Sequence, residues 1–527
     1  MKAIVRRKLW SEKRGIERRL EGAVRVNEGG PVLRAGNIDY EIAEKTRGIA
    51  HGGIGMIQRV VQKVGLAPRI DAALNLLKIH KPYHESDHVL NIAYNILAGG
   101  TCLEDIEHLR NNEVYLDGLA AKTIPDPTTA GDFCRRFDVP DIVALMEAIN
   151  EVRLGVWRRQ PKKFFKQAVI DADGTLATTY GECKEGMDIS YKGQWGYHPL
   201  VISLANTGEP LYLVNRSGNR PSHEGAGEWL DRAVGLCRRA GFKDILLRGD
   251  TDFTQTEKLD GWDDAGVGFI FGIDAMPNLV AMANELPQSA WKRLVRGPKH
   301  EVKTDPRARP ENVKERIVRE REFENIHLNG EDVAEVGYQP TKCRKIYRLV
   351  VVRKNLTVEK GEQALFDDVR YFFYISNQEG LWAEEVVGQA NGRCNQENLI
   401  EQLKNGARAM EMPVDNLVSN WAYMVMASLA WTLKAWFALG LPQSGRWAQK
   451  YQTQKESLLK MEFKKFLNVM MRLPCQVART GRRIVYRLLS WNPWQEVLLR
   501  AVDALRPCGP AGPQSTVVAA RRVGLRC

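Results

Sequence analysis

Apolar and polar positions alternate in blocks between residues 164 and 274, and this pattern predicts a series of strands and helices. Short apolar runs predict buried strands, whereas apolar positions three and four residues apart predict helices. The polar stretch Asn206–Pro210 between two apolar runs is a hairpin signal. The predicted order is three strands, a helix, a strand, a helix and a strand, at Phe164–Asp173, Pro199–Leu204, Leu211–Val214, Glu224–Ala240, Ile245–Leu247, Thr254–Ala265 and Val267–Ile273.

This order is the layout of a ribonuclease-H-like fold, an α/β fold in which helices flank a mixed sheet. The chain of 527 residues is too long for one ordinary core, so we expect several domains. The expected organisation is a helical N-terminal region at 1–160, the first part of the core at 161–274, a β-rich insertion at 275–378, a glutamate-bearing helix completing the core at 379–412, a helical basic C-terminal region at 413–505 and a disordered tail at 506–527.

The apolar run that comes closest to a membrane span is Trp421–Leu433. Its 13 residues fall short of the roughly 20 that cross a bilayer, so a buried helix in a soluble protein is the better interpretation. The N-terminus is basic but has no apolar segment of the kind found in secretion signals. The nine cysteines are scattered without a Cys-x-x-Cys pair, which favours a reducing, cytoplasmic compartment over a disulfide framework or a zinc ribbon.

The formal net charge of +12 indicates a polyanionic partner. Two basic clusters contain an aromatic residue, as is common where a protein meets nucleic acid. They are Trp291 with Lys292, Arg293, Arg296 and Lys299, and Tyr486 with Arg479, Arg482, Arg483 and Arg487. Phosphate contacts from such clusters would make binding strongly salt-dependent.

Asp173, Asp250 and Glu397 are three acidic residues that a sheet edge and a neighbouring helix could bring together. Asp171 and Asp173 are two apart on a strand and point to the same face, and Asp250 follows an apolar strand expected to lie beside the first. Glu397 lies on a late helix whose polar stripe also contains Arg393, Glu401 and Lys404, and whose apolar stripe contains Leu399, Ile400, Leu403 and Met410. The alternative interpretation is that the aspartates are turn residues and the stripe is a solvated, salt-bridged face.

The joint pattern favours a site for divalent metal. Mg²⁺ and Mn²⁺ prefer hard oxygen ligands, and a pair of such ions stabilises the attacking and leaving oxygens of a phosphodiester reaction. We therefore expect Asp173, Asp250 and Glu397 to bind two Mg²⁺ ions, for which Mn²⁺ could substitute. The cationic Arg393 and Lys404 beside them would hold phosphates.

At these residues the chain resembles the DDE transposases of bacterial insertion sequences. Arg393, Glu397 and Lys404 match three of the four points of the signature Y-x2-R-x3-E-x6-K, with Ala390 at the tyrosine position. Asp171–Thr175 resembles the family's D-[GS]-T block and Arg248–Phe253 its R-x-D-S-x-F block, which identifies Asp173 and Asp250 as the aspartates. Gly193–Pro199 and Leu97–Gly100 are similar to the group named for insertion sequence thirteen-eighty.

The resemblance implies a DNA transposase. Such an enzyme binds the terminal inverted repeats of an insertion sequence, cleaves DNA at the element ends and joins the 3′-hydroxyl ends to target DNA. It implies Asp173, Asp250 and Glu397 as catalytic metal ligands, with Arg393 and Lys404 positioning DNA. The place of His198 near the pocket adds it as a DNA-positioning residue. Partners would be double-stranded DNA and a second copy of the chain in a synaptic homodimer, in the nucleoid-associated cytoplasm of a bacterium.

Within this interpretation, the helices at 55–160, with Arg135 and Arg136, are the expected reader of the terminal repeats. Which basic segment binds the ends and which binds the target stays open, as does a hairpin route of cleavage. A non-transposing, domesticated DNA-binding protein on the same scaffold is the runner-up, against which the intact acidic triad argues.

A zinc metalloprotease is the rival from another enzyme class, because His84–His88 fits H-E-x-x-H and Glu104 or Glu107 offers a third ligand. That motif needs both histidines on one helical face. Ser86 or Asp87 has the character of an N-cap, however, and a helix beginning there leaves His84 outside. The transposase is therefore preferred.

Overall fold

The computed structural model describes residues 3–24, 40, 46–179, 181, 184–296, 313–360, 363–480 and 483–505. The tail at 506–527, expected to be disordered, lies outside the described residues, as do Lys299 and Arg482 of the two basic clusters.

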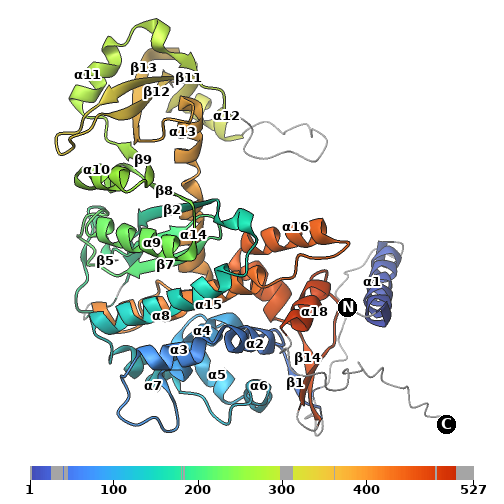
Figure 1. Cartoon of the computed structure of the whole chain (residues 1–527). Coiled ribbons are helices and arrows are strands. Elements are labelled where there is room, and N and C mark those ends of the chain that lie inside the picture. Colours follow the sequence, from blue (N-terminus) through green and yellow to red (C-terminus); the bar gives the residue numbers. More distant parts are fainter. Residues whose placement is uncertain are drawn as a thin grey trace.

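A nine-stranded mixed sheet runs from the middle of the molecule, at β7, to its upper end in Figure 1, at β11–β13. Its strand order is β10-β11-β12-β13-β9-β8-β2-β6-β7, in which β8 is parallel to β2 and β9 and the other neighbours are antiparallel. All seven elements predicted for 164–274 are present, including the β6–β7 hairpin. The strands are β2 (Gln167–Gly174), β6 (Leu200–Leu204), β7 (Glu209–Val214), β8 (Asp244–Gly249), β9 (Gly268–Ile273), β10 (Lys292–Arg293), β11 (Glu324–Tyr338), β12 (Tyr347–Lys360) and β13 (Gln363–Ser376).

Helices cover both faces of this sheet because successive strand residues point to opposite sides. Leu247 of β8 belongs to the larger apolar cluster, together with Leu230 of helix α9 (Ala226–Ala240). Its neighbour Leu246 belongs to a second cluster, together with Val387 of helix α13 (Ala383–Asn391). Helices α9 and α13 therefore lie on opposite faces. Helix α14 (Cys394–Glu401), which follows α13, contacts β2.

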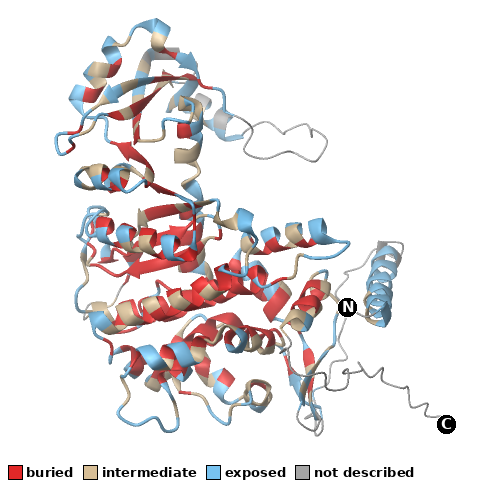
Figure 2. Ribbon diagram, in the orientation of Figure 1, coloured by how far each residue is buried: buried red, intermediate tan, exposed pale blue. Residues whose placement is uncertain are grey.

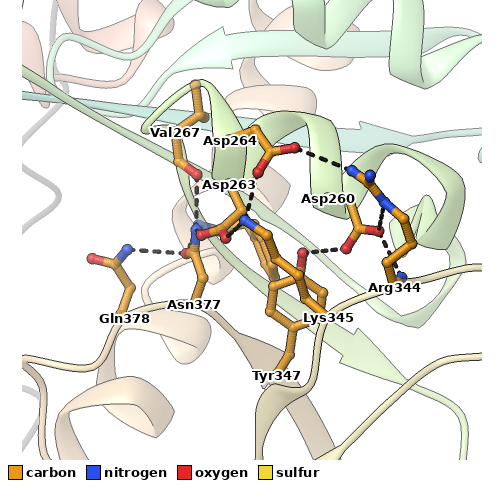
Figure 3. A network of polar contacts seen from close by, with 10 residues as sticks. Asp260, Asp263, Asp264, Val267, Arg344, Lys345, Tyr347, Asn377 and Gln378 are labelled. Carbon is orange, nitrogen blue, oxygen red and sulfur yellow. Dashed lines mark hydrogen bonds and ion pairs between the residues drawn. The ribbon is translucent and has the colours of Figure 1, made fainter.

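The predicted β-rich insertion continues the central sheet. Strand β13 pairs antiparallel with β9, so that Phe373 is opposite Ile273, and β12, β11 and β10 follow outward. A polar network also fixes these strands to helix α10 (Thr256–Asp264), as Figure 3 shows. In it the Tyr347 hydroxyl donates to Asp260 over 2.6 Å, and the Asn377 side chain donates to Asp263 over 2.8 Å.

Helices occupy both ends of the chain. The N-terminal ones are α1 (Ala3–Val24), α2 (Ile54–Val64), α3 (Leu66–Ala73), α4 (Glu85–Ala98), α5 (Ile106–Arg110), α6 (Glu113–Leu119), α7 (Pro127–Cys134) and α8 (Val139–Trp157). The C-terminal ones are α15 (Leu417–Leu439), α16 (Ala448–Leu459), α17 (Phe463–Phe466) and α18 (Gln495–Ala504). Shorter elements are β3 (Ala177–Thr178), β4 (Asp188–Ile189), β5 (Trp195–Tyr197), α11 (Pro277–Glu285) and α12 (Val313–Glu320).

Helix α15 contains Trp421–Leu433, the apolar run that comes closest in sequence to a membrane span. It is long and apolar enough to cross a membrane, but its most apolar 18-residue window is 100% buried inside the protein. It lies against α4, α8 and β7, and Figure 2 shows it buried along most of its length. The helix thus serves as a core element, in agreement with the prediction of a buried helix.

The C-terminal stretch also contains a hairpin where only helices and a basic segment were expected. Strands β14 (Cys475–Thr480) and β15 (Arg483–Leu488) pair with each other, and β14 also pairs with β1 (Gly48–Ile49) from the other end of the chain. In β15 the half-buried Ile484, Tyr486 and Leu488 alternate with the exposed Arg483, Val485 and Arg487. The density of arginines obscured this two-residue period, which is the strand signal.

Candidate active site

Two aspartates lie at the same edge of the sheet because β2 and β8 are parallel neighbours. Asp171 is opposite Arg248 in the ladder, and Asp173 and Asp250 each follow two residues later. The Asp173 side chain is 13% exposed and that of Asp250 is 32% exposed, so both carboxylates are reachable from solvent. The prediction that these two strands are neighbours is confirmed.

A single guanidinium lies between the two carboxylates. Arg393 Nη1 is 3.4 Å from Asp173 Oδ2 and 3.5 Å from Asp250 Oδ2. Arg393 lies at the junction between α13 and α14, and Glu397 is one turn further along α14. One cation therefore contacts both aspartates. Helix α14, which contains Glu397, contacts β2, and the Glu397 charge acts on Asp173.

The electrostatics of the site favour a bound cation. Burial raises the pKa of Asp173 to about 7; the nearby Asp250 and Glu397 also raise it, whereas Arg393 opposes the shift. Burial likewise raises the pKa of Asp250, again opposed by Arg393. Closely placed, partly buried carboxylates resist ionisation until positive charge compensates them.

The donor set fits a divalent ion with hard oxygen ligands, with Arg393 acting as the stand-in cation. The guanidinium lies between the Asp173 and Asp250 carboxylates, and Glu397 is near enough to Asp173 to raise its pKa. Asp173, Asp250 and Glu397 are nevertheless not all within 4.8 Å of one another; in the described part of the chain, that spacing is reached by His80, His84 and Glu85. The carboxylate oxygens of Asp173, Asp250 and Glu397 are therefore farther apart than the ligands of one bound metal ion.

Comparison with known proteins identifies the family. The model of the family described as "Transposase DDE domain group 1" matches residues 46–510. The chain belongs to this family. Among curated proteins no significant match is found. Among solved structures, the cryo-EM structure of a piggyBac transposase synaptic complex with hairpin DNA covers 89% of this chain and 88% of its own, at 11% identity and a TM-score of 0.31.

In this DDE transposase family member, Lys404 and His198 also lie near the end of β2. Lys404 is in a π-helical turn at Gln402–Gly406, and its Nζ donates to the Leu176 carbonyl over 2.7 Å. Burial lowers its pKa, while Glu401 and Asp173 raise it. His198 is buried; its Nδ1 is 2.7 Å from the Arg220 carbonyl, and a Cβ added to Gly174 would lie 3.2 Å from its Nε2.

The signature segment is not one continuous helix. Helix α13 ends at Asn391, α14 begins at Cys394, and the π-helical turn follows. Leu399, Ile400, Leu403 and Met410 are all buried, as their predicted docking role requires. The break places Arg393 at the start of α14, where its side chain reaches both aspartates.

Two polar contacts behind the site were not foreseen from the transposase sequence. Arg248 and Asp171 form a buried two-point ion pair, Nε to Oδ1 at 2.7 Å and Nη2 to Oδ2 at 2.8 Å, and Arg248 Nη1 donates to the Gln389 carbonyl of α13 over 2.8 Å. Gln396 is buried between α14 and β6, donating to the Val201 carbonyl over 3.0 Å. The ion pair of Arg248 with Asp171 could have been predicted, because Arg248 lies in an apolar strand and buried charged residues are rare unless they are paired.

The structure also shows whether His84 and His88 have the geometry that the zinc-protease motif requires. Helix α4 begins at Glu85 with His84 as its N-cap, not Ser86 or Asp87 as expected, because Asp87 accepts the His84 backbone N–H over 2.9 Å. His84 is therefore outside the helix, as predicted. His88 is buried and stacks on Phe133 at a centroid distance of 4.3 Å. The two histidines do not share one helical face, so H-E-x-x-H geometry is not formed.

Arg135, expected beside the DNA-reading surface, is engaged within the protein. Its guanidinium bonds Asp415 at 3.0 Å and Asp132 at 2.8 Å, which joins α7 to the segment before α15.

Proposed function

We propose that this protein is an active DNA transposase whose reaction takes place at Asp173, Asp250 and Glu397. The observation on which the proposal depends is the Arg393 guanidinium placed between Asp173 and Asp250, on the helix junction that also brings Glu397 to the sheet. The order β7-β6-β2-β8-β9, with three antiparallel strands followed by two parallel ones, supports a ribonuclease-H-like core for this site. The strands β10–β13 would then be its insertion.

The three carboxylates would hold two Mg²⁺ ions, or Mn²⁺ in their place. When bound, such ions activate the attacking oxygen and stabilise the leaving oxygen of a phosphodiester. Residues of the chain itself would bind and position the DNA. Arg393 and Lys404 would hold the phosphates on either side of the cut, since a guanidinium and an ammonium both bind phosphate oxygens. His198 would support the backbone at Gly174, directly after Asp173.

The substrate would be double-stranded DNA, which a net charge of +12 favours. The proposed reaction is cleavage at the terminal inverted repeats of an insertion sequence and joining of the 3′-hydroxyl ends to target DNA. Two ends must be handled together, so the proposal includes a synaptic homodimer. Its sequence motifs resemble the group named for insertion sequence thirteen-eighty, and the proposal includes action in the cytoplasm of a bacterium.

The test uses the full-length protein and linear DNA ending in the element's own terminal repeats, with Mg²⁺ present. Asp173→Asn, Asp250→Asn and Glu397→Gln should each lower end cleavage by about 100-fold or more while DNA binding in a gel-shift assay is retained. Asp252→Asn and Glu401→Gln are matched controls, because both are exposed acids within four residues of a proposed ligand.

Cleavage that survives in any of the three variants would remove that residue from the site. A wild-type protein that binds the repeats but never nicks them, with Mg²⁺ or Mn²⁺, would instead be the domesticated DNA-binding protein.

A further inference from the structure

His80, His84 and Glu85 gather at the start of helix α4, in the N-terminal helical region. They lie at the end of the connection between α3 and α4, which spans residues 74–84. One ligand atom from each of the three side chains lies within 4.8 Å of the other two. His80 Nε2 is 3.1 Å from one Glu85 carboxylate oxygen and 3.3 Å from the other.

The His80–Glu85 distance is that of neighbouring ligands in a tetrahedral coordination shell, and His84 has a ligand atom within 4.8 Å of both. Zinc bonds to histidine nitrogen and carboxylate oxygen are about 2.0–2.2 Å long, which places neighbouring ligand atoms roughly 3.3 Å apart. Two imidazoles and one carboxylate are a common donor set for a transition metal, and imidazole suits Zn²⁺, Cu²⁺ and Ni²⁺ better than Mg²⁺. The donors thus differ in kind from the all-oxygen set at the sheet edge.

The carboxylate is held in place by the backbone. Glu85 is 1% exposed, and its Oε1 accepts the N–H groups of Leu76 over 3.0 Å and Leu77 over 3.1 Å. A buried anion with fixed orientation is the main element of a preformed cation site.

The second imidazole distinguishes this cluster from a simple ion pair. The rings of His80 and His84 stack at a centroid distance of 5.2 Å and an interplanar angle of 16°. His327 and Glu359 form a comparable pair at 3.0 Å, yet no third ligand joins them at such spacing in the described residues. The positive end of α4 opposes a cation here, but Glu85 and Asp87 in its first turn offset that effect.

We propose that His80, His84 and Glu85 bind one divalent transition-metal ion, preferably Zn²⁺, with water in the fourth position. The ion would fasten the α3–α4 connection to the first turn of α4. This site is independent of the transposase reaction, and it uses only two residues of the H-E-x-x-H motif, since His88 is packed against Phe133.

The test measures metal binding by the full-length protein after chelator treatment and dialysis. To remove binding at the sheet edge, the background variant is Asp173→Asn with Asp250→Asn. We expect one equivalent of Zn²⁺, and Co²⁺ in its place should give the visible absorption of a tetrahedral nitrogen-containing site. His80→Ala and His84→Ala should each weaken binding by about 100-fold or more, because loss of a direct ligand should cost at least as much as the roughly 10–100-fold lost with a residue that only orients a ligand.

His327→Ala is the matched control, and it should bind Zn²⁺ as the background protein does. His80 and His84 are exposed, so their truncation should leave the fold intact, which circular dichroism checks. The proposal fails if the background protein binds no stoichiometric Zn²⁺, or if His80→Ala and His84→Ala bind it as tightly as His327→Ala. Because end cleavage is not measured, failure here leaves the proposed transposase reaction untouched.

Discussion

His88 illustrates how burial changes a single ionisable side chain. It is 3% exposed and lies between two aromatic rings, stacked on Phe133 and edge-on to Tyr83 at a centroid distance of 5.6 Å. Burial and then Arg136 lower the pKa of His88 from 6.5 to about 4, while Glu85 and Asp126 oppose that shift. The folded protein therefore holds this imidazole neutral at pH values where an unfolded chain would protonate it.

Acidification should consequently destabilise the protein through His88. Between pH 6.5 and 4 the unfolded state binds the additional proton, so the stability contributed by neutral His88 is complete above pH 6.5 and falls as the pH decreases. The whole shift corresponds to about 3 kcal/mol. His88→Phe should lose this dependence, and its urea-unfolding midpoint should fall less between pH 6.5 and 4 than that of the wild type.

His108→Gln is the control for that comparison, because His108 is exposed on α5. It should follow the wild-type curve. Parallel curves for His88→Phe and the wild type would contradict the prediction.

For single residues, the sequence predicted where a side chain lies in the fold better than which other side chains it contacts. Asp173 and Asp250 could be placed because hydrophobic pattern determines where a strand ends, and parallel neighbours end at the same edge. Arg393 could be named from a motif, but its place between the two aspartates depends on where the helix breaks, which no local pattern specifies. The ion pair of Asp171 with Arg248 joins residues 77 apart and depends on strand register.

Among elements, the junction between α13 and α14 matters most for the site. Arg248 reaches from β8 to the Gln389 carbonyl near the end of α13, passing directly over Gly392. A Cβ at Gly392 would lie 2.6 Å from Arg248 Nη1, so any larger residue would push the end of the Arg248 side chain away. The sheet, the end of α13 and the start of α14 are therefore fixed to one another next to Arg393.

Gly392→Ala should disturb this junction and, with it, the proposed reaction. The added methyl group would displace Arg248 from the Gln389 carbonyl, and the overpacking should cost about 1–3 kcal/mol. Because Arg393 and Glu397 follow directly, end cleavage should fall about 10- to 100-fold. Cleavage assays on terminal-repeat DNA, together with urea unfolding, measure both effects.

Gly388→Ala in helix α13, which ends just before Gly392, is the matched control, since a Cβ there meets nothing within 4 Å. It should keep wild-type cleavage and gain up to about 1 kcal/mol of stability from helix propensity. If Gly392→Ala behaved the same way, the anchoring role of Arg248 would be wrong.

Helices and strands whose apolar residues recur at a regular spacing were predicted well. Those in which charged residues hide that spacing were not. The strands and helices of 164–274 and the buried run inside α15 have unbroken apolar patterns. Strand β15 does not, because Val485 interrupts the alternation and arginines occupy the other two exposed positions. The pairing of β14 with β1 joins the two ends of the chain, and long-range pairing of this kind has no local signal.

At the scale of the whole molecule, one buried charge connects three parts of the chain that are far apart in sequence. Glu209 of β7 is 0% exposed and accepts from Arg153 Nε of α8 over 3.1 Å. It also accepts the indole N–H groups of Trp157 in α8 and Trp436 in α15, each over 2.9 Å. The N-terminal helices, the sheet and the C-terminal helices thus share a single acceptor.

Removing this acceptor should weaken the whole molecule. In Glu209→Ala the Arg153 charge would stay buried without its partner and both indoles would lose their acceptor, at a cost of about 3–5 kcal/mol. Glu228→Ala is the control, because Glu228 is 68% exposed and its 3.3 Å pair with Arg232 should contribute less than about 1 kcal/mol. Urea unfolding followed by tryptophan fluorescence compares them, since Trp157 and Trp436 of the network are among the thirteen tryptophans. If the Glu209→Ala midpoint moved no further than that of Glu228→Ala, the three parts would be held together by apolar packing alone.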